Sequence, residues 1–160
     1  MIVLGLDVAT NTGFCVGDVD RDTKNAVWVQ SGVVNFEPKR GEGKGMRFLR
    51  FRRWLYDMIE EFKPGIIAYE QSHHRGGPAT EVGVGLTTIV MEVGDEKEIP
   101  YATVRTSTLK KEATGKGNAG KAEMVAAANA LGAPYPGGIE SDDEADAIHI
   151  FRWAVENFSV

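Results

Sequence analysis

Four acidic side chains stand where carboxylates can do chemistry together. Asp7 ends the apolar residues 2–6, and Glu70 ends a second apolar run, residues 66–69. Asp143 and Asp146 lie three residues apart, which places them on adjoining positions of one helix face. Like charges within a few ångström repel one another, so such a cluster requires a cation. Carboxylate oxygens suit Mg²⁺ or Mn²⁺, and a pair of these ions about 3.5–4 Å apart can drive phosphodiester cleavage.

Each of these residues also has a simpler explanation when taken alone. An aspartate before a turn, such as Asp7 before residues 8–13, often bonds only its own backbone. Glu70 could be a solvated charge at a strand end, and Asp143 suits the positive start of a helix. Asp146 is harder to explain in this way, because it lies beyond the first helical turn and beside an apolar stripe.

The basic residues are unevenly distributed along a chain whose net charge is −5. That charge argues against a simple nucleic-acid coat protein. Seven Lys and Arg fall within residues 39–53 and five within residues 105–121, of 18 in all. Two solvated faces would explain this clustering, and so would a groove that binds phosphates beside an acidic metal site.

The bulk composition indicates an ordinary globular chain. Cys15 is the only cysteine, so no internal disulfide can form, and a reducing, cytoplasmic setting is expected. No apolar run approaches about 18 residues, and the start of the chain lacks the charged lead of a signal peptide. We therefore expect neither a membrane span nor a cleaved leader.

The acidic residues need a scaffold of strands and helices to bring them together. Alternation and apolar periodicity predict these elements: strands at residues 1–7, 14–19, 26–36, 66–69 and 100–104, and helices ending near residue 62 and at 80–93, 121–131 and 142–157. Residues 115–120 form a basic glycine loop. The order predicts an α/β fold, a mixed five-stranded sheet flanked by helices, as one domain over residues 1–160. If the first and fourth strands are parallel neighbours, Asp7 and Glu70 emerge side by side.

Three motifs, in this order, resemble those of the RuvC-type Holliday junction resolvases, which have the ribonuclease-H-like fold. They are LGLDVATNTG at residues 4–13, IIAYEQ at residues 66–71 and SDDEADA at residues 141–147. No single motif is specific, but the ordered set covers nearly the whole chain. The resemblance is to a cellular or a bacteriophage-encoded member, acting in the cytoplasm of a bacterial cell or of a phage-infected host.

The resemblance implies an activity and a set of site residues. Asp7, Glu70, Asp143 and Asp146 would hold two Mg²⁺ (or Mn²⁺) ions per subunit, and Lys121 would join them as a catalytic residue. The family has two lysines eleven residues apart that contact phosphates, and Lys110 and Lys121 have this spacing. The residues expected to bind DNA are Arg105, Lys110, Lys111, Lys116, Lys121, His73, His74 and Arg75. His73 stands where many members carry a stacking aromatic residue.

The resemblance further implies a homodimer that resolves four-way junction DNA by paired symmetric nicks. The helix at residues 80–93 is the candidate dimer helix, although a core-facing helix would look the same.

A ribonuclease-H-like nuclease acting on RNA–DNA hybrid, flap or branched DNA would need the same carboxylates. A junction-binding scaffold without catalysis is less consistent with four acidic residues close to phosphates. Asp7, Thr10 and Gly13 also resemble the phosphate hairpin of actin-like sugar kinases, but those enzymes need a second domain that 160 residues do not provide.

Overall fold

Two apolar strands form the centre of a five-stranded sheet in a computed structural model that describes residues 1–72 and 76–158. β1 (Ile2–Asp7) and β4 (Ile66–Glu70) are almost fully buried and pair in parallel, so the condition stated from the sequence is met. β2 (Asn11–Val19) and β3 (Ala26–Asn35) extend the sheet in antiparallel fashion, and β5 (Tyr101–Val104) pairs in parallel with β4. The strand order is β3-β2-β1-β4-β5, which confirms the predicted mixed sheet.

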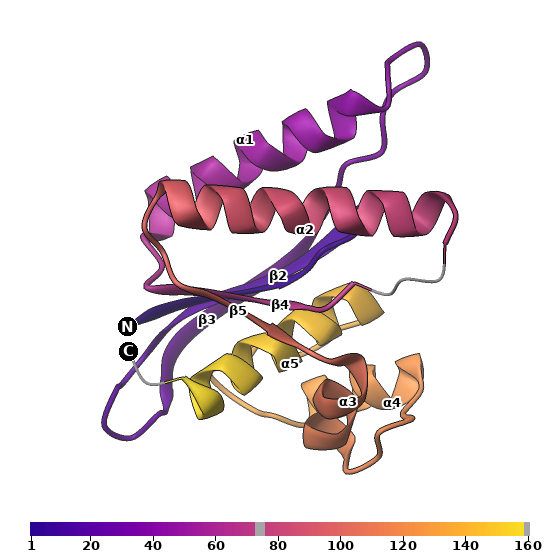
Figure 1. The fold of residues 1–160 in the computed structure, drawn as a ribbon. Coiled ribbons are helices and arrows are strands. Elements are labelled where there is room, and N and C mark those ends of the chain that lie inside the picture. Colours follow the sequence, from indigo (N-terminus) through magenta and orange to yellow (C-terminus); the bar gives the residue numbers. More distant parts are fainter. Residues whose placement is uncertain (73–75, 159–160) are drawn as a thin grey trace.

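Helices cover both faces of this sheet (Figure 1). They are α1 (Gly45–Phe62), α2 (Pro78–Glu96), α3 (Thr106–Thr114), α4 (Lys121–Asn129) and α5 (Asp142–Asn157). One core, containing Phe51, Leu86 and Leu4, lies between the sheet and the α1–α2 layer. The second core, which contains Val3 and Ile148, lies under α5, and α3 and α4 pack beside α5. None of these helices, within the described residues, has the length and apolar character that crossing a bilayer requires.

Glycines in β1 and β2 allow α5 to rest directly on the sheet backbone. A Cβ atom added at Gly5 would lie 2.7 Å from the backbone nitrogen of Phe151. A Cβ at Gly13 would lie only 1.9 Å from the carbonyl oxygen of Asp143, far inside van der Waals contact. A larger residue at either place would force the helix away from the strands. The glycines thus bring the start of α5 close to the end of β1.

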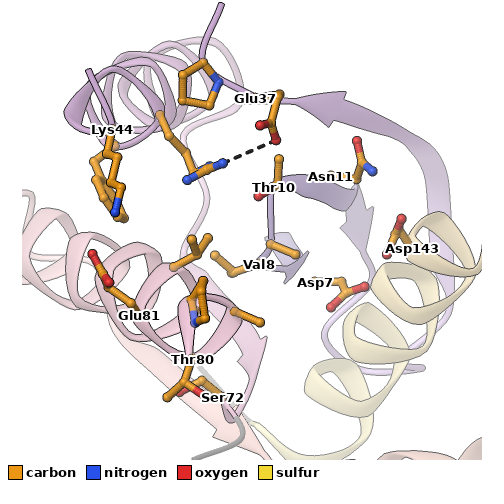
Figure 2. A pocket seen from close by; sticks show the side chains of 18 of the residues that line it. Asp7, Val8, Thr10, Asn11, Glu37, Lys44, Ser72, Thr80, Glu81 and Asp143 are labelled. Carbon is orange, nitrogen blue, oxygen red and sulfur yellow. Dashed lines mark hydrogen bonds and ion pairs between the residues drawn. The ribbon is translucent and has the colours of Figure 1, made fainter. Parts of the chain in front are cut away.

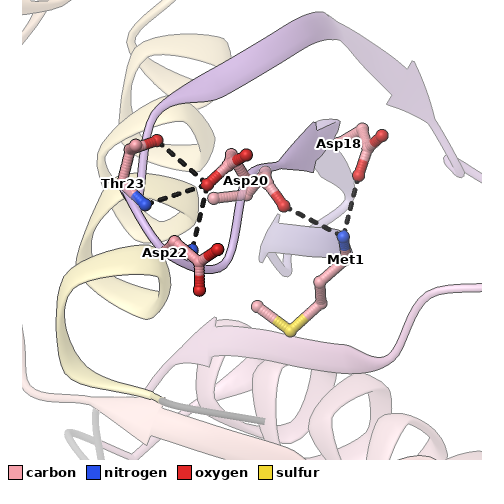
Figure 3. A network of polar contacts seen from close by, with 6 residues as sticks. Met1, Asp18, Asp20, Asp22 and Thr23 are labelled. Carbon is pink, nitrogen blue, oxygen red and sulfur yellow. Dashed lines mark hydrogen bonds and ion pairs between the residues drawn. The ribbon is translucent and has the colours of Figure 1, made fainter.

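A polar network closes the hairpin at the opposite end of the sheet from Asp7 (Figure 3). The Asp20 carboxylate accepts hydrogen bonds from the backbone N–H groups of Asp22 (3.0 Å) and Thr23 (2.9 Å). The Met1 ammonium donates to Asp18 at 2.8 Å. The Asp20 contacts hold the β2–β3 turn, and the Met1–Asp18 contact ties the start of β1 to the end of β2.

The structure corrects three sequence predictions. Residues 106–114 form helix α3, whereas the sequence predicted no element there; only Leu109 is buried in this helix, so no apolar periodicity marked it. β2 begins at Asn11 rather than at residue 14. α2 is longer than the predicted 80–93, since it runs from Pro78 to Glu96.

Candidate functional site

Three carboxylates from separate elements converge at the carboxyl ends of β1 and β4. Asp7 ends β1, Glu70 ends β4, and Asp146 lies in the second turn of α5. Each offers one oxygen that lies within 4.8 Å of the others. The parallel pairing of Leu6 with Tyr69 explains why Asp7 and Glu70 emerge together. The sequence prediction that these residues lie side by side is therefore confirmed.

Asp143 also belongs to this site, through its contact with Asp7. It is not one of the three converging residues, but its side chain is hydrogen-bonded to that of Asp7. We call Asp7, Glu70, Asp143 and Asp146 the acidic cluster. The start of α5 is held by Ser141, which accepts a hydrogen bond from the Glu144 backbone N–H at 3.4 Å. The Glu144 carboxylate accepts one from Ser31 of β3 at 2.7 Å.

The three aspartates of the acidic cluster resist ionisation. Burial raises the pKa of Asp7 well above its usual range, and the charges of Asp146, Glu70 and Asp143 raise it further. Burial, followed by the charge of Glu70, raises the pKa of Asp146 to about 7. Burial and the neighbouring Asp142 raise the pKa of Asp143. A divalent cation would offset both the burial and the repulsion, and an all-carboxylate donor set fits Mg²⁺ or Mn²⁺.

Basic side chains approach the acidic cluster from the α3–α4 side. Lys110 and Lys121 line a small cavity of about 140 Å³ together with Glu70, Asp142 and Asp146. The Lys121 ammonium lies 3.7 Å from Asp142, and 86% of its side chain is exposed. The structure thus brings both lysines of the predicted eleven-residue spacing to the acidic cluster.

The other residues predicted to bind DNA lie farther out or outside the described part of the chain. Arg105 caps the start of α3, and Lys111 is exposed on that helix. Lys116 lies 3.7 Å from Glu123. His73, His74 and Arg75 lie outside the described residues.

A larger cleft of about 900 Å³ opens on the α1–α2 side of the acidic cluster (Figure 2). Asp7 and Asp143 lie at one side of this cleft, and Lys44 and Glu81 lie opposite them. Arg47 also lines the cleft, where its guanidinium donates to a Glu37 carboxylate oxygen at 3.2 Å. Other basic residues of segment 39–53 are also paired: Arg50 with Glu42 at 2.5 Å and Arg52 with Glu92 at 2.8 Å.

Sequence reasoning missed two residues beside the acidic cluster. The Thr106 hydroxyl donates a hydrogen bond to Glu70. The sequence carried no signal of this contact, because it depends on the β4–β5 register, which pairs Glu70 with Val104. Asp142 was not among the predicted site residues, yet it contacts Lys121 and raises the pKa of Asp143. Its position just before Asp143 was the available signal.

The strand order, the helix across β1 and β2 and the carboxylates at the strand ends define a ribonuclease-H-like fold. Solved structures agree with this class. The structure of Thermus thermophilus RuvC in complex with a Holliday junction substrate matches with a TM-score of 0.76 and 21% identity, covering 95% of this chain and 91% of that one. The yeast mitochondrial Holliday junction resolvase Ydc2 matches with a TM-score of 0.65 and 17% identity, covering 96% and 78%.

Two relatives found by sequence comparison have the same name. The crossover junction endodeoxyribonuclease RuvC of Prochlorococcus marinus is 27% identical over 155 residues, covering 94% of this chain and 93% of its own. That of Rickettsia bellii is 27% identical over 152 residues, covering 94% of both chains. No protein-family model matches the chain. The comparisons thus confirm, over nearly the whole chain, the resemblance to RuvC-type resolvases that the motifs indicated.

Proposed function

We propose that this chain is a metal-dependent endodeoxyribonuclease that resolves four-way DNA junctions by paired symmetric nicks. The observation that carries the proposal is the convergence of Asp7, Glu70 and Asp146, with Asp143 hydrogen-bonded to Asp7, in a fold similar to that of junction resolvases. The proposal treats residues 1–160 as a single RuvC-like nuclease domain. The similar enzymes are named for the same activity.

The acidic cluster is the proposed ligand set for two Mg²⁺ ions per subunit, with Mn²⁺ as a substitute. Such ions, when bound, supply an activated water and stabilise the leaving oxygen. The protein's own contribution is to hold four carboxylates on rigid elements. Asp7 and Asp146 give up protons as the ligand set becomes fully ionised, which follows from their raised pKa values.

Lys110 and Lys121 are the proposed phosphate contacts beside the cut. Lys121 is exposed, and its 3.7 Å separation from Asp142 makes a weak ion pair, so its ammonium can turn towards a phosphate at little cost. Lys110 lies on the same side of the acidic cluster and opposes the raised pKa of Asp146. Arg105, Lys111 and Lys116 would extend this contact along the DNA.

A homodimer would present two acidic clusters to the two strands that must be cut. α2 is the proposed dimer helix, because it exposes Val84 (39%) and Met91 (38%) seven residues apart on one face. Apolar side chains exposed at this spacing are suited to a second copy of the same helix.

The test is cleavage of a labelled four-way junction, a linear duplex and an RNA–DNA hybrid, each with Mg²⁺, Mn²⁺ or EDTA. We expect paired symmetric nicks in the junction alone, lost in EDTA. Asp7→Asn should abolish cleavage and retain junction binding, whereas Asp57→Asn, on the exposed face of α1, should cleave normally.

Other outcomes would contradict the proposal in distinct ways. Cleavage of the hybrid or duplex would indicate a general ribonuclease-H-like nuclease with the same metal site. Tight junction binding without any cleavage would indicate a scaffold. Normal cleavage by Asp7→Asn would show that the metal-ligand assignment is wrong.

A further inference from the structure

Thr106 contacts the acidic cluster although it carries no charge. Its hydroxyl donates a hydrogen bond to Oε1 of Glu70, across two neighbouring elements. The sheet register explains the contact. Glu70 pairs with Val104 at the end of the parallel β4–β5 ladder, and the backbone N–H of Gln71 donates to the Val104 carbonyl at 2.8 Å. α3 then begins at Thr106, two residues beyond Val104.

A hydrogen bond to one oxygen of a glutamate restricts the whole carboxylate. The terminal torsion of a glutamate is broad, so a free Glu70 would sample many orientations at the edge of the sheet. Fixing Oε1 leaves the second oxygen available in a defined direction. Carboxylates that ligate metals are commonly held by partners of this kind, and losing such a partner typically costs 10–100-fold in metal affinity or activity.

The same helix also carries a lysine of the proposed phosphate contact. Thr106 and Lys110 are four residues apart, so they share one face of α3, and both line the small cavity beside Glu70 and Asp146. Leu109, between them in sequence, is 2% exposed and anchors α3 in the core. α3 is therefore fixed to the protein interior on one side and contacts the acidic cluster on another.

We propose that Thr106 is a positioning residue that orients Glu70 for a divalent cation through its hydroxyl. This inference rests on the proposed function, since Glu70 must be a metal ligand for its orientation to matter. Through Thr106, α3 ties the orientation of Glu70 to the element that carries Lys110.

The experiment measures Mn²⁺ affinity by calorimetry in the full-length protein without DNA. Thr106→Val removes the hydroxyl and keeps the shape, and Thr106→Ser keeps the hydroxyl. Thr108→Val is the matched control, because Thr108 is exposed on the same helix. We expect Thr106→Val to bind Mn²⁺ about 10–100-fold more weakly, and the serine and control variants to bind like the wild type. The Mn²⁺ concentration that gives half-maximal junction cleavage should rise in parallel.

Each alternative result has a definite meaning. If Thr106→Val binds Mn²⁺ as tightly as the wild type, the positioning role is wrong, while wild-type cleavage leaves the nuclease assignment intact. If the wild type neither binds Mn²⁺ nor cleaves any substrate, both proposals are wrong. If Thr106→Val unfolds, the Mn²⁺ affinities of Thr106→Ala and Thr106→Ser are compared instead. Weaker binding by the alanine variant alone would support the role of the hydroxyl, and equal affinities would show that this role is wrong.

Discussion

The members of the acidic cluster differ in how readily they give up a proton. Burial raises the pKa of Asp7, and the charge of Asp146 raises it further. Burial and the charge of Glu70 raise the pKa of Asp146 to about 7. Burial also raises the pKa of Asp143, whose side chain is hydrogen-bonded to that of Asp7. In the absence of metal the protein therefore retains protons in the site near neutral pH. A divalent cation must displace them.

The pH dependence of metal binding follows from this competition. A carboxyl group with a raised folded-state pKa stabilises the fold below its unfolded pKa, and this contribution is lost as the pH rises through the folded value. For Asp146 the loss occurs between about pH 4 and 7. The metal-free protein should therefore lose stability over this range, and the rise in melting temperature caused by Mg²⁺ should be larger at pH 8 than at pH 6.

Thermal melts with and without Mg²⁺ at both pH values measure this effect. Asp146→Asn is the informative variant, because it cannot bind a proton or act as an anionic ligand. Its metal-free form should be more stable than the wild type at pH 8, by on the order of 1 kcal/mol, which corresponds to about 2–4 °C for a chain of this size. An Mg²⁺ effect that is the same at both pH values would contradict the assigned competition.

At the scale of elements, long periodic segments were predictable and short ones were not. α5 has the predicted bounds, Asp142–Asn157, because acidic residues start it and an apolar stripe runs its length. α3 was missed because one buried residue, Leu109, cannot produce a period. The parallel pairing of β1 with β4 was stated as a condition, since sequence alone does not determine which strands are neighbours.

The candidate site was predictable to the same extent as its elements. Asp7 and Glu70 could be named because each ends a strand, and Asp143 and Asp146 because they lie three residues apart near the start of a helix. The hydrogen bond between Asp7 and Asp143 and the contact of Thr106 with Glu70 could not, since they depend on how closely α5 and α3 approach the sheet. That approach is determined by packing between segments that are distant in the sequence.

Gly13 should be essential for the position of α5. A Cβ at this residue would lie 1.9 Å from the Asp143 carbonyl oxygen, so Gly13→Ala should displace the helix start and destabilise the fold by about 1–3 kcal/mol or more. Mg²⁺ affinity should fall with it, because Asp143 and Asp146 move away from Asp7. Gly137→Ala is the control, since nothing lies within 4 Å of a Cβ there.

Denaturant melts and Mg²⁺ titrations of the two glycine variants check this prediction. A Gly13→Ala protein with wild-type stability and metal affinity would show that α5 can shift without consequence for the acidic cluster.

On the scale of the whole molecule, cationic side chains lie on both sides of the acidic cluster. The α3–α4 side carries Lys110 and Lys121, and the cleft on the α1–α2 side carries Lys44 and Arg47. These cationic groups make an overall charge of −5 compatible with the proposed DNA binding, even though Glu37, Glu42 and Glu81 also line the cleft.

Salt dependence separates a phosphate contact from a structural lysine. Each lost phosphate contact should lower the slope of log affinity against log salt by about 0.9 for duplex arms. Lys121→Ala should show this change in junction binding, measured by fluorescence anisotropy at several salt concentrations. Arg21→Ala, in the exposed β2–β3 turn at the far end of the sheet, should not. An unchanged slope for Lys121→Ala would show that Lys121 does not contact the DNA phosphates.

The proposed dimer can be tested through the exposed face of α2. Val84→Glu with Met91→Glu places like charges where the two helices would meet, so the double variant should be monomeric by analytical ultracentrifugation. It should still bind Mg²⁺, because neither residue contacts the acidic cluster. Val27→Glu, on the exposed surface of β3 (62% exposed), is the control and should remain dimeric. A monomeric wild type would contradict the dimer.

The contact of α5 with the backbone at Gly5 and Gly13 has a consequence for how the sequence can change over time. The spacing between β1 and α5 is determined by main-chain atoms, which every sequence shares, and not by the sizes of interlocking side chains. Substitutions among the aliphatic residues of the α1–α2 layer, on the far face of the sheet, would leave this backbone contact itself unchanged. Substitutions accumulating there would lower the melting temperature long before they altered the chemistry, provided the glycines stayed.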